Sequence, residues 1–158
     1  MPGLTIAQVT PFAWEVAGEV NEYVARVSDE LARRGHRVLI IAPSQSSALV
    51  RDTRRTLRTD PEALLAGDGP TLLGIGEVLP FAPTRRRTGS LPVDVARTIE
   101  SAFSALALDV VNVHEPFAPS ASRAALRHSR ALNVGSFHAP TERLLSTQLT
   151  GPLTRLLL

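Results

Sequence analysis

The stretch DVVNVHEPFAPS, residues 109–120, decides the fold of this chain. Its first part, residues 109–113, contains three valines and predicts a short buried strand, because β-branched side chains favour strands. The strand then meets His114, Glu115 and Pro116, which a buried strand interior does not hold without cause. In an open α/β sheet, ligands bind outside the carboxyl ends of the parallel strands. We therefore expect a binding site here, against the simpler alternative that His114 and Glu115 only solvate a strand end.

The chain before this stretch predicts a strand, a helix and a second strand. Residues 4–9 (LTIAQV) predict the first strand, and residues 36–42 (HRVLIIA) predict the second, stopped by Pro43. Between them, apolar residues recur at helical spacing, and Gly35 is well placed to cap the helix. The apolar stripe of this helix comprises Val20, Tyr23, Val24, Val27 and Leu31. The helix N-terminus suits an anion, although no GxGxxG fingerprint is present.

The other predicted elements continue the alternation of strands and helices. They are a loop with a short helix over residues 44–70, a strand over 71–77, strand or hairpin over 78–81, a helix capped by Ser90, a helix over 120–130, a strand over 132–137 and a helix from Thr141. This order predicts an α/β, Rossmann-like, doubly wound and mostly parallel sheet with helices on both faces. Because His138 follows the strand at 132–137, two strands deliver histidines to one rim. We expect a crevice there that holds His114, Glu115, His138 and the loop at Gly18.

The composition indicates one globular domain with an aliphatic core. The chain has 158 residues, of which 44% are hydrophobic and only 4% aromatic. It contains no apolar run of about 18 residues that would span a membrane, and no basic segment precedes its first apolar run, as a signal peptide would require. Without cysteine it forms neither disulfides nor thiolate metal sites. These features favour a cytoplasmic location.

All 17 basic residues are arginine, and the net charge is only +2. Two clusters stand out, one at Arg51, Arg54, Arg55 and Arg58 and one at residues 85–87. A solvated helix face is the usual meaning of the first cluster, and contact with anionic lipid or phosphate is the alternative. No aromatic residues are interleaved with the arginines to stack on bases, so we expect no nucleic-acid partner.

The usual catalytic motifs are absent from the sequence. No Walker A segment and no GxSxG elbow occurs, which argues against a nucleotide hydrolase and a serine hydrolase. His114, Glu115 and His138 make at most a partial ligand set, and neither HExxH nor HxH spacing appears. We therefore expect no metal site.

Three segments in this order carry a family resemblance: residues 11–44, residues 109–120, and GSFHAPTER at residues 135–143. They resemble the N-terminal domain of the family-4 retaining glycosyltransferases, with most similarity to the phosphatidylinositol mannosyltransferases, over residues 4–158. The resemblance implies one Rossmann-like half of a glycosyltransferase-B fold, with the C-terminal donor-binding domain absent from residues 1–158. It further implies retaining transfer of a mannose-like sugar from a GDP- or UDP-sugar to a lipid-linked or polyol-phosphate acceptor. It implies neither metal nor cofactor, and an isolated domain that is inactive.

The resemblance also implies roles for individual residues. His138 matches a catalytic histidine beside the transferred sugar, and the alternative is that it caps the following helix. Phe12 matches an aromatic residue beside the acceptor ring, whereas Arg143 and Ser146 match residues that hold the acceptor phosphate. The other implied positions are Trp14 and Glu15, which would face the acceptor, and His114 and Glu115, which would shape the site.

The sequence departs from the family pattern in two places. Where the family has a Gly-Gly pair in the donor loop, this chain has Gly18 and Glu19, which puts bulk and negative charge where the donor diphosphate would lie. The helix after the third strand is nearly neutral, so contact with an anionic membrane at the inner face would depend on Arg85, Arg86 and Arg87. Glu19 and the apolar chain end at residues 156–158 suggest an alternative, a non-catalytic half-domain that binds a glycan or phosphate and needs a partner chain.

Overall fold

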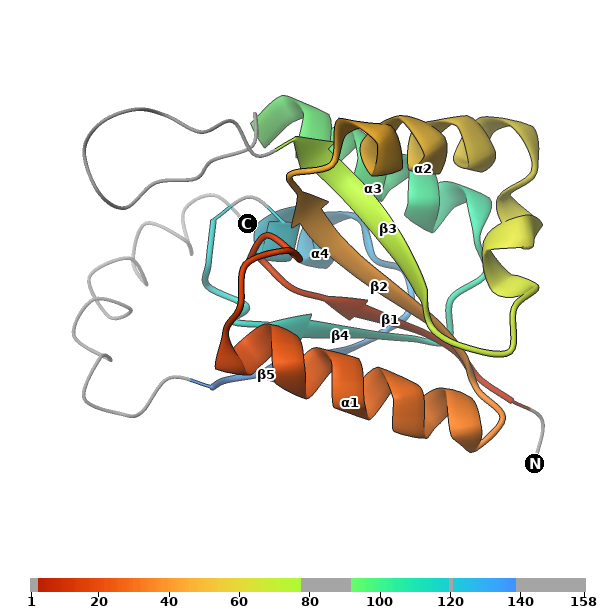
Figure 1. The fold of residues 1–158 in the computed structure, drawn as a ribbon, viewed down its shortest axis with the longest axis vertical. Coiled ribbons are helices and arrows are strands. Elements are labelled where there is room, and N and C mark those ends of the chain that lie inside the picture. Colours follow the sequence, from red (N-terminus) through yellow and green to blue (C-terminus); the bar gives the residue numbers. More distant parts are fainter. Residues whose placement is uncertain (1–2, 78–91, 120, 139–158) are drawn as a thin grey trace.

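A computed structural model describes residues 3–77, 92–119 and 121–138 of the chain (Figure 1). Five parallel strands form one sheet in the order β3-β2-β1-β4-β5. In chain order the elements are β1 (Thr5–Val9), α1 (Glu19–Arg33), β2 (Arg37–Ser44), α2 (Ser47–Thr59), the 3₁₀ helix η1 (Pro61–Leu65), β3 (Thr71–Glu77), α3 (Pro92–Ala105), β4 (Val110–His114), α4 (Ala121–His128) and β5 (Leu132–Ser136).

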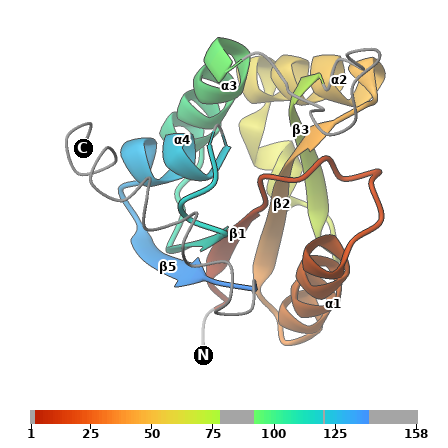
Figure 2. The same cartoon turned by 90° about the vertical axis from the view of Figure 1, so that its left-hand side faces the viewer.

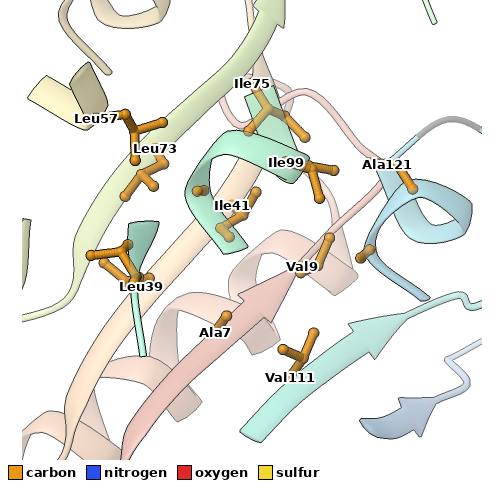
Figure 3. Close-up of a cluster of buried hydrophobic side chains, with 14 of the residues drawn as sticks. Ala7, Val9, Leu39, Ile41, Leu57, Leu73, Ile75, Ile99, Val111 and Ala121 are labelled. Carbon is orange, nitrogen blue, oxygen red and sulfur yellow. The ribbon is translucent and has the colours of Figure 1, made fainter. Parts of the chain in front are cut away.

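Helices cover both faces of the sheet, which confirms the predicted Rossmann-like α/β architecture. Helix α1 lies on one face, whereas α2, α3 and α4 lie together on the other (Figures 1 and 2). The main core fills the space between the sheet and these three helices, and its side chains are aliphatic (Figure 3). It includes Val9, Leu39, Ile41, Leu73, Ile75, Val95, Ile99, Val111 and Val113, all fully buried. The predicted aliphatic core is therefore confirmed.

The central strands β1 and β4 present different side chains to the two faces of the sheet. Ala7, Val9, Val111 and Val113 belong to the apolar core on the α2–α4 face. Because side chains alternate along a strand, the residues between them point to the α1 face. These intervening residues are Ile6, Gln8, Asn112 and His114. Gln8 and Asn112 are register partners, so three polar side chains meet on one face.

The second strand continues past the residue that was predicted to stop it. Pro43 lies inside β2, which ends at Ser44, so the prediction that Pro43 ends the strand was wrong. Proline lacks the N–H that a regular ladder needs. Here the pairing of β2 with β3 shifts register between Ala42 and Ser44, and the Pro43 carbonyl instead accepts a 2.9 Å hydrogen bond from the Trp14 N–H. The irregular pairing accommodates the proline.

Helix α1 agrees with its predicted extent but not with all of its predicted stripe. Gly35 has a left-handed φ of 87° just after the helix, and its N–H donates to the Ala32 carbonyl at 2.8 Å, as expected of a helix terminator. Val24 is fully buried. Tyr23, which the helical spacing assigned to the buried stripe, is instead 48% exposed. Its ring lies edge-on to the imidazole of His138, with the two centroids 4.9 Å apart.

Several predictions fall outside the described residues. They are the strand or hairpin at residues 78–81, the Ser90 cap, the arginines at 85–87, the helix from Thr141, and the acceptor residues Arg143 and Ser146. The loop with a short helix predicted over residues 44–70 is a thirteen-residue α2, capped by the Ser46 hydroxyl, followed by η1.

Candidate functional site

The carboxyl ends of β4 and β5 bring His114 and His138 together. The two strands are neighbours, and His114 is the register partner of Ser136, two residues before His138. As a result, His114 Nδ1 lies 2.8 Å from His138 Nε2, within hydrogen-bond distance. The sequence placed both histidines on one rim, and the structure joins them directly.

His114 is completely buried and does not open onto a crevice, contrary to our expectation. Its Nε2 lies 2.8 Å from Gln8 Oε1, and its carbonyl accepts a 3.0 Å hydrogen bond from the Ser122 hydroxyl. Burial, and secondarily the proximity of His138, lowers the pKa of His114 to about 4. The His114 imidazole is therefore neutral at pH 7, and it contacts His138 from a buried position.

A polar network on the α1 face supports His114. Asn112 Nδ2 donates to Gln8 Oε1 at 2.9 Å, and the Ser136 hydroxyl donates to Asn112 Oδ1 at 2.9 Å. Gln8 is 2% exposed, so its amide is withdrawn from solvent. Sequence reasoning missed these three residues. The available signal was the presence of polar side chains at alternate positions of otherwise aliphatic strands.

His138 is partly exposed and is held from three sides. Its backbone N–H donates to Glu115 Oε1 at 2.8 Å, and its Nε2 faces His114. The third contact comes from Tyr23 of α1, whose ring meets the imidazole edge-on with centroids 4.9 Å apart at 65°. Such edge contacts are favourable for aromatic rings. Tyr23, too, was missed as a site residue, because its helical spacing is equally that of a core position.

Glu115 joins the ends of the two strands in a strained conformation. It has a φ of 50°, a left-handed backbone that costs a non-glycine residue about 1–2 kcal/mol. Its N–H donates to the Ser136 carbonyl and its carbonyl accepts from the Ala118 N–H, both at 2.8 Å. These bonds and the carboxylate bond to His138 hold the residue in place. Glu115 thus fixes the backbone from which His138 projects.

The loop between β1 and α1 is organised by Asn21. This buried side chain accepts a 3.0 Å hydrogen bond from the Thr10 hydroxyl and donates to the carbonyls of Ala13 and Val16 at 2.9 and 3.2 Å. Phe12 lies on the same loop and is 46% exposed, which leaves its ring accessible to a ligand. The loop is therefore ordered by one helix residue while it presents an aromatic surface.

The two neighbours Trp14 and Glu15 tie this loop to the end of β2. The Glu15 carboxylate accepts hydrogen bonds from the Ser44 hydroxyl and, at 2.9 Å, from the Gln45 N–H. Burial acts to raise the pKa of Glu15, but these hydrogen bonds outweigh it and leave the pKa below its usual value. The backbone N–H of Trp14, a partly buried residue, donates to the Pro43 carbonyl. Glu15 therefore has a structural task within the loop.

Gly18 and Glu19 begin helix α1. Gly18 is extended, and a side chain placed on it would meet no atom within 4 Å, so neither sterics nor backbone angles require glycine there. Glu19 is exposed and, with Glu22, lies in the first helical turn, where negative charge stabilises the helix dipole. The glutamate has a local structural role at the position where the family pattern has its second glycine.

Two of the predicted arginines line a separate cleft between α2 and α3. The cleft has a volume of about 270 Å³ and is lined by Arg54, Leu57, Arg58, Asp94, Arg97, Thr98 and Ser101. Arg54 lies 3.9 Å from the Asp94 carboxylate and donates to the Thr98 hydroxyl at 3.4 Å. Arg51, Arg55 and Arg58 are exposed, and only Arg54 is half-buried. The arginine cluster on α2 is thus only partly a solvated face.

The described part of the chain offers neither a metal-binding cluster nor a membrane-spanning helix. Within residues 3–77, 92–119 and 121–138, no group of three or more His, Asp or Glu side chains is arranged to hold a metal ion. Within the same ranges, no helix combines the length and apolar character needed to cross a lipid bilayer.

The sequence of this chain is similar to those of known proteins. The sequence model of Glycosyltransferase Family 4 matches residues 20–158. The chain belongs to this family. Its similarity extends to proteins called phosphatidyl-myo-inositol mannosyltransferase from Mycobacterium tuberculosis and Mycolicibacterium smegmatis, each 25% identical over 143 residues, and from Mycobacterium leprae, 24% identical over 147 residues.

These alignments cover 90% of this chain but only 33–34% of each mycobacterial protein. The chain thus spans about a third of the length of the curated relatives it matches. The family resemblance found in the sequence motifs is therefore confirmed, and the similarity concerns one part of each mycobacterial protein.

Proposed function

We propose that this chain is the acceptor-binding half of a retaining glycosyltransferase. In this proposal, a mannose-like sugar passes from a GDP- or UDP-sugar to a lipid-linked or polyol-phosphate acceptor, without metal or cofactor. Membership of glycosyltransferase family 4 supports the reaction class. The name of the mycobacterial relatives, phosphatidyl-myo-inositol mannosyltransferase, supports the choice of mannose and of an inositol-containing acceptor. A C-terminal donor-binding domain would complete the cleft.

The observation that carries the proposal is the fixed position of His138 at the carboxyl end of β5. It is partly exposed at the edge where open α/β sheets bind ligands, yet Glu115, His114 and Tyr23 hold it. A histidine fixed in this way can hydrogen-bond a sugar hydroxyl without first being ordered by the substrate. The exposed Phe12 would stack against the acceptor ring, with Arg143 and Ser146 on its phosphate.

The test is turnover by the complete natural polypeptide that contains this chain. It would be incubated with GDP-mannose, or in parallel UDP-glucose, and vesicles containing phosphatidylinositol, and sugar transferred to lipid would be measured. We expect His138→Ala to lower kcat by about 10²-fold or more, because a positioned group at the reacting centre is lost. His128→Ala on α4 is the matched control and should retain activity. Absence of transfer from any nucleotide-sugar would overturn the proposal.

Glu19 favours a second function, a non-catalytic half-domain that binds a glycan or phosphate with a partner chain. Its exposed carboxylate at the start of α1 would repel a donor diphosphate. The two functions differ in one variant of the complete polypeptide, Glu19→Gly. For a transferase that tolerates Glu19, the variant lowers the KM for the nucleotide-sugar, because the repelling carboxylate is removed. For a pure binding module, the isolated chain binds myo-inositol 1-phosphate in calorimetry while neither form transfers sugar.

Location and membrane contact belong to the same proposal. A cytoplasmic protein with peripheral contact at the inner membrane face would reach a lipid acceptor, and Arg85, Arg86 and Arg87 supply the positive charge. Co-sedimentation with vesicles containing anionic phosphatidylinositol should then weaken as salt increases. Replacement of the three arginines by glutamine should abolish it, whereas replacement of Arg51 and Arg55 by glutamine should not.

A further inference from the structure

The direction of the hydrogen bonds around His114 follows from Gln8. The carboxamide oxygen of Gln8 can only accept, and two nitrogens approach it: Asn112 Nδ2 at 2.9 Å and His114 Nε2 at 2.8 Å. His114 Nε2 therefore carries a hydrogen. Asn112 Nδ2 and His114 Nε2 are 3.4 Å apart, farther than either is from Gln8, so each donates to Gln8 rather than to the other.

Burial then determines the other nitrogen of His114. The residue is fully buried, and its side-chain contacts among the described residues are two amides (Gln8 and Asn112), a phenol (Tyr23) and a second imidazole (His138), none of which favours a charged ring. The nearby Glu115 carboxylate accepts the His138 backbone N–H. A neutral imidazole carries one hydrogen, and in His114 it is on Nε2. His114 Nδ1 therefore has a lone pair and accepts.

The position of the ring hydrogen in His138 follows from that in His114. Its Nε2 lies 2.8 Å from the accepting Nδ1 of His114, so His138 Nε2 must carry the hydrogen that joins the two rings. In the neutral ring of His138 the remaining nitrogen, Nδ1, is then an acceptor. If His138 takes a proton, it does so at Nδ1, and the bond to His114 is unchanged.

We propose that Gln8, Asn112 and His114 are positioning residues that hold the hydrogen of His138 on Nε2 and keep its Nδ1 as an acceptor for a ligand hydroxyl. The inference deepens the proposed function, on which the nature of that ligand rests. It specifies that the sugar or polyol hydroxyl beside His138 donates its hydrogen to the ring. A ligand group that can only accept, such as an ether oxygen or a carbonyl, would not be held at Nδ1 of the neutral ring.

The opposite arrangement requires two amides to rotate together. If Gln8 presented its NH₂ group to His114, the Asn112 amide would also have to turn, and both rings would then carry hydrogen on Nδ1. The Ser136 hydroxyl, which donates to Asn112 Oδ1 at 2.9 Å, holds the arrangement described here. Because hydroxyls can also accept, the two directions must be distinguished by experiment.

The test is the tautomeric state of the imidazoles in the ¹⁵N-labelled 158-residue chain at pH 7. Long-range ¹H–¹⁵N correlation spectra distinguish protonated from bare ring nitrogens, and single His→Gln variants at His36, His114, His128 and His138 assign the four rings. We expect His114 and neutral His138 to carry hydrogen on Nε2, with about a tenfold or greater excess over the other tautomer, as one net hydrogen bond supplies. Hydrogen on Nδ1 of neutral His138 would overturn the proposal.

A variant pair tests whether Gln8 causes the preference. Gln8→Met has a similar volume but no acceptor, so the tautomer excess at both rings should fall several-fold. Thr5→Val on the same strand is the matched control and should leave the tautomers unchanged. An unchanged tautomer ratio in Gln8→Met contradicts the proposal that Gln8 sets the tautomer of His138 through His114. If that variant does not fold, Ser136→Ala is measured against the same expectation.

These results are independent of turnover. If His138 has the expected tautomer but the complete polypeptide transfers no sugar, the proposed role of Gln8, Asn112 and His114 is supported and the proposed function is wrong. If transfer occurs but the tautomer of His138 is reversed, the proposed function is supported and the proposed role of Gln8, Asn112 and His114 is wrong. If both hold, Gln8→Met should lower kcat more than it raises the KM for acceptor, because it misdirects His138 without removing a ligand contact.

Discussion

The two faces of strands β1 and β4 perform different tasks, although their residues alternate along the same backbone. On the α2–α4 face, Val9 and Val111 pack in a continuous aliphatic core. On the α1 face, Gln8, Asn112 and His114 form a hydrogen-bonded network that extends to the partly exposed His138. Buried polar groups contribute little net stability but leave a large penalty when a partner is removed. The α2–α4 face therefore stabilises the fold, whereas the α1 face holds His138 in a defined orientation.

This division explains how a small sheet holds an ordered polar site at its edge. The network lies inside the sheet, where each member is fixed by a neighbouring strand, rather than on a loop. The aliphatic face anchors the same strands, so the network does not have to stabilise itself. Changes on the first face should reduce stability without altering His138. Changes on the second face should alter His138 and also leave buried polar groups without a partner.

The largest effect is expected on the apolar face. Ile41→Ala removes a fully buried side chain in β2 and should lower the free energy of unfolding by about 2–5 kcal/mol, measured by urea denaturation. The milder Ile41→Val should cost about 0.5–1.5 kcal/mol. In Ile41→Val the His138 tautomer should be that of the wild type. A changed tautomer in that variant would show that the two faces are not independent.

The next effect is a pH dependence that belongs to the polar face. The pKa of His114 is about 4 in the folded chain, below its ordinary value of 6.5, so the unfolded chain binds a proton more readily. The stability due to neutral His114 is complete above about pH 6.5 and is lost as the pH falls towards 4. The whole change is on the order of 3 kcal/mol, since one pKa unit corresponds to about 1.4 kcal/mol.

Carboxylates also titrate below pH 5, so the measurement needs a variant that lacks only the imidazole. His114→Gln should be less stable than the wild type at pH 7, but its free energy of unfolding should fall less steeply between pH 6.5 and 4.5. Parallel slopes for the two proteins would contradict the assignment of this pH dependence to His114.

A smaller effect is expected at the strained joint between the two strands. Glu115→Ala removes the carboxylate that accepts the His138 N–H, and should cost about 1 kcal/mol or more. Glu115→Gln keeps an acceptor oxygen and should cost less. Hydrogen exchange at the His138 amide should be faster in the alanine variant than in the glutamine variant. Equal exchange rates would mean that the carboxylate does not hold this backbone.

Much of the fold was predictable from residue patterns, because aliphatic runs mark buried parallel strands directly. Both histidines were also predictable as rim residues, since each follows such a run. What could not be predicted was that His114 is buried. A strand end is polar in sequence whether its side chain points to solvent or into a network, and only the packing distinguishes the two.

The supporting residues were missed for a related reason. Gln8 and Asn112 become partners through the register of β1 on β4, which connects positions 104 residues apart. A single sequence carries no record of that register. Tyr23 has the spacing of a core residue, but its half-exposed ring lies beside His138. Helical spacing predicts which residues share one face of a helix, but not which part of the protein that face contacts.

The smallest effect contrasts removal of a hydroxyl from the apolar face with removal of an amide from the polar face. Thr5 is fully buried, and its hydroxyl has no hydrogen-bond partner among the described residues. Thr5→Val removes that unpaired group and should raise the free energy of unfolding by about 0.5–1 kcal/mol. Gln8→Met also replaces a buried polar side chain by an apolar one, yet it leaves Asn112 and His114 without their acceptor and should lower the free energy. Opposite signs in urea denaturation would establish that burial alone does not set the cost of a polar group in this sheet, because its partners decide it. If both variants gained stability, the polar network would contribute nothing to folding, and its retention would have to rest on His138 alone.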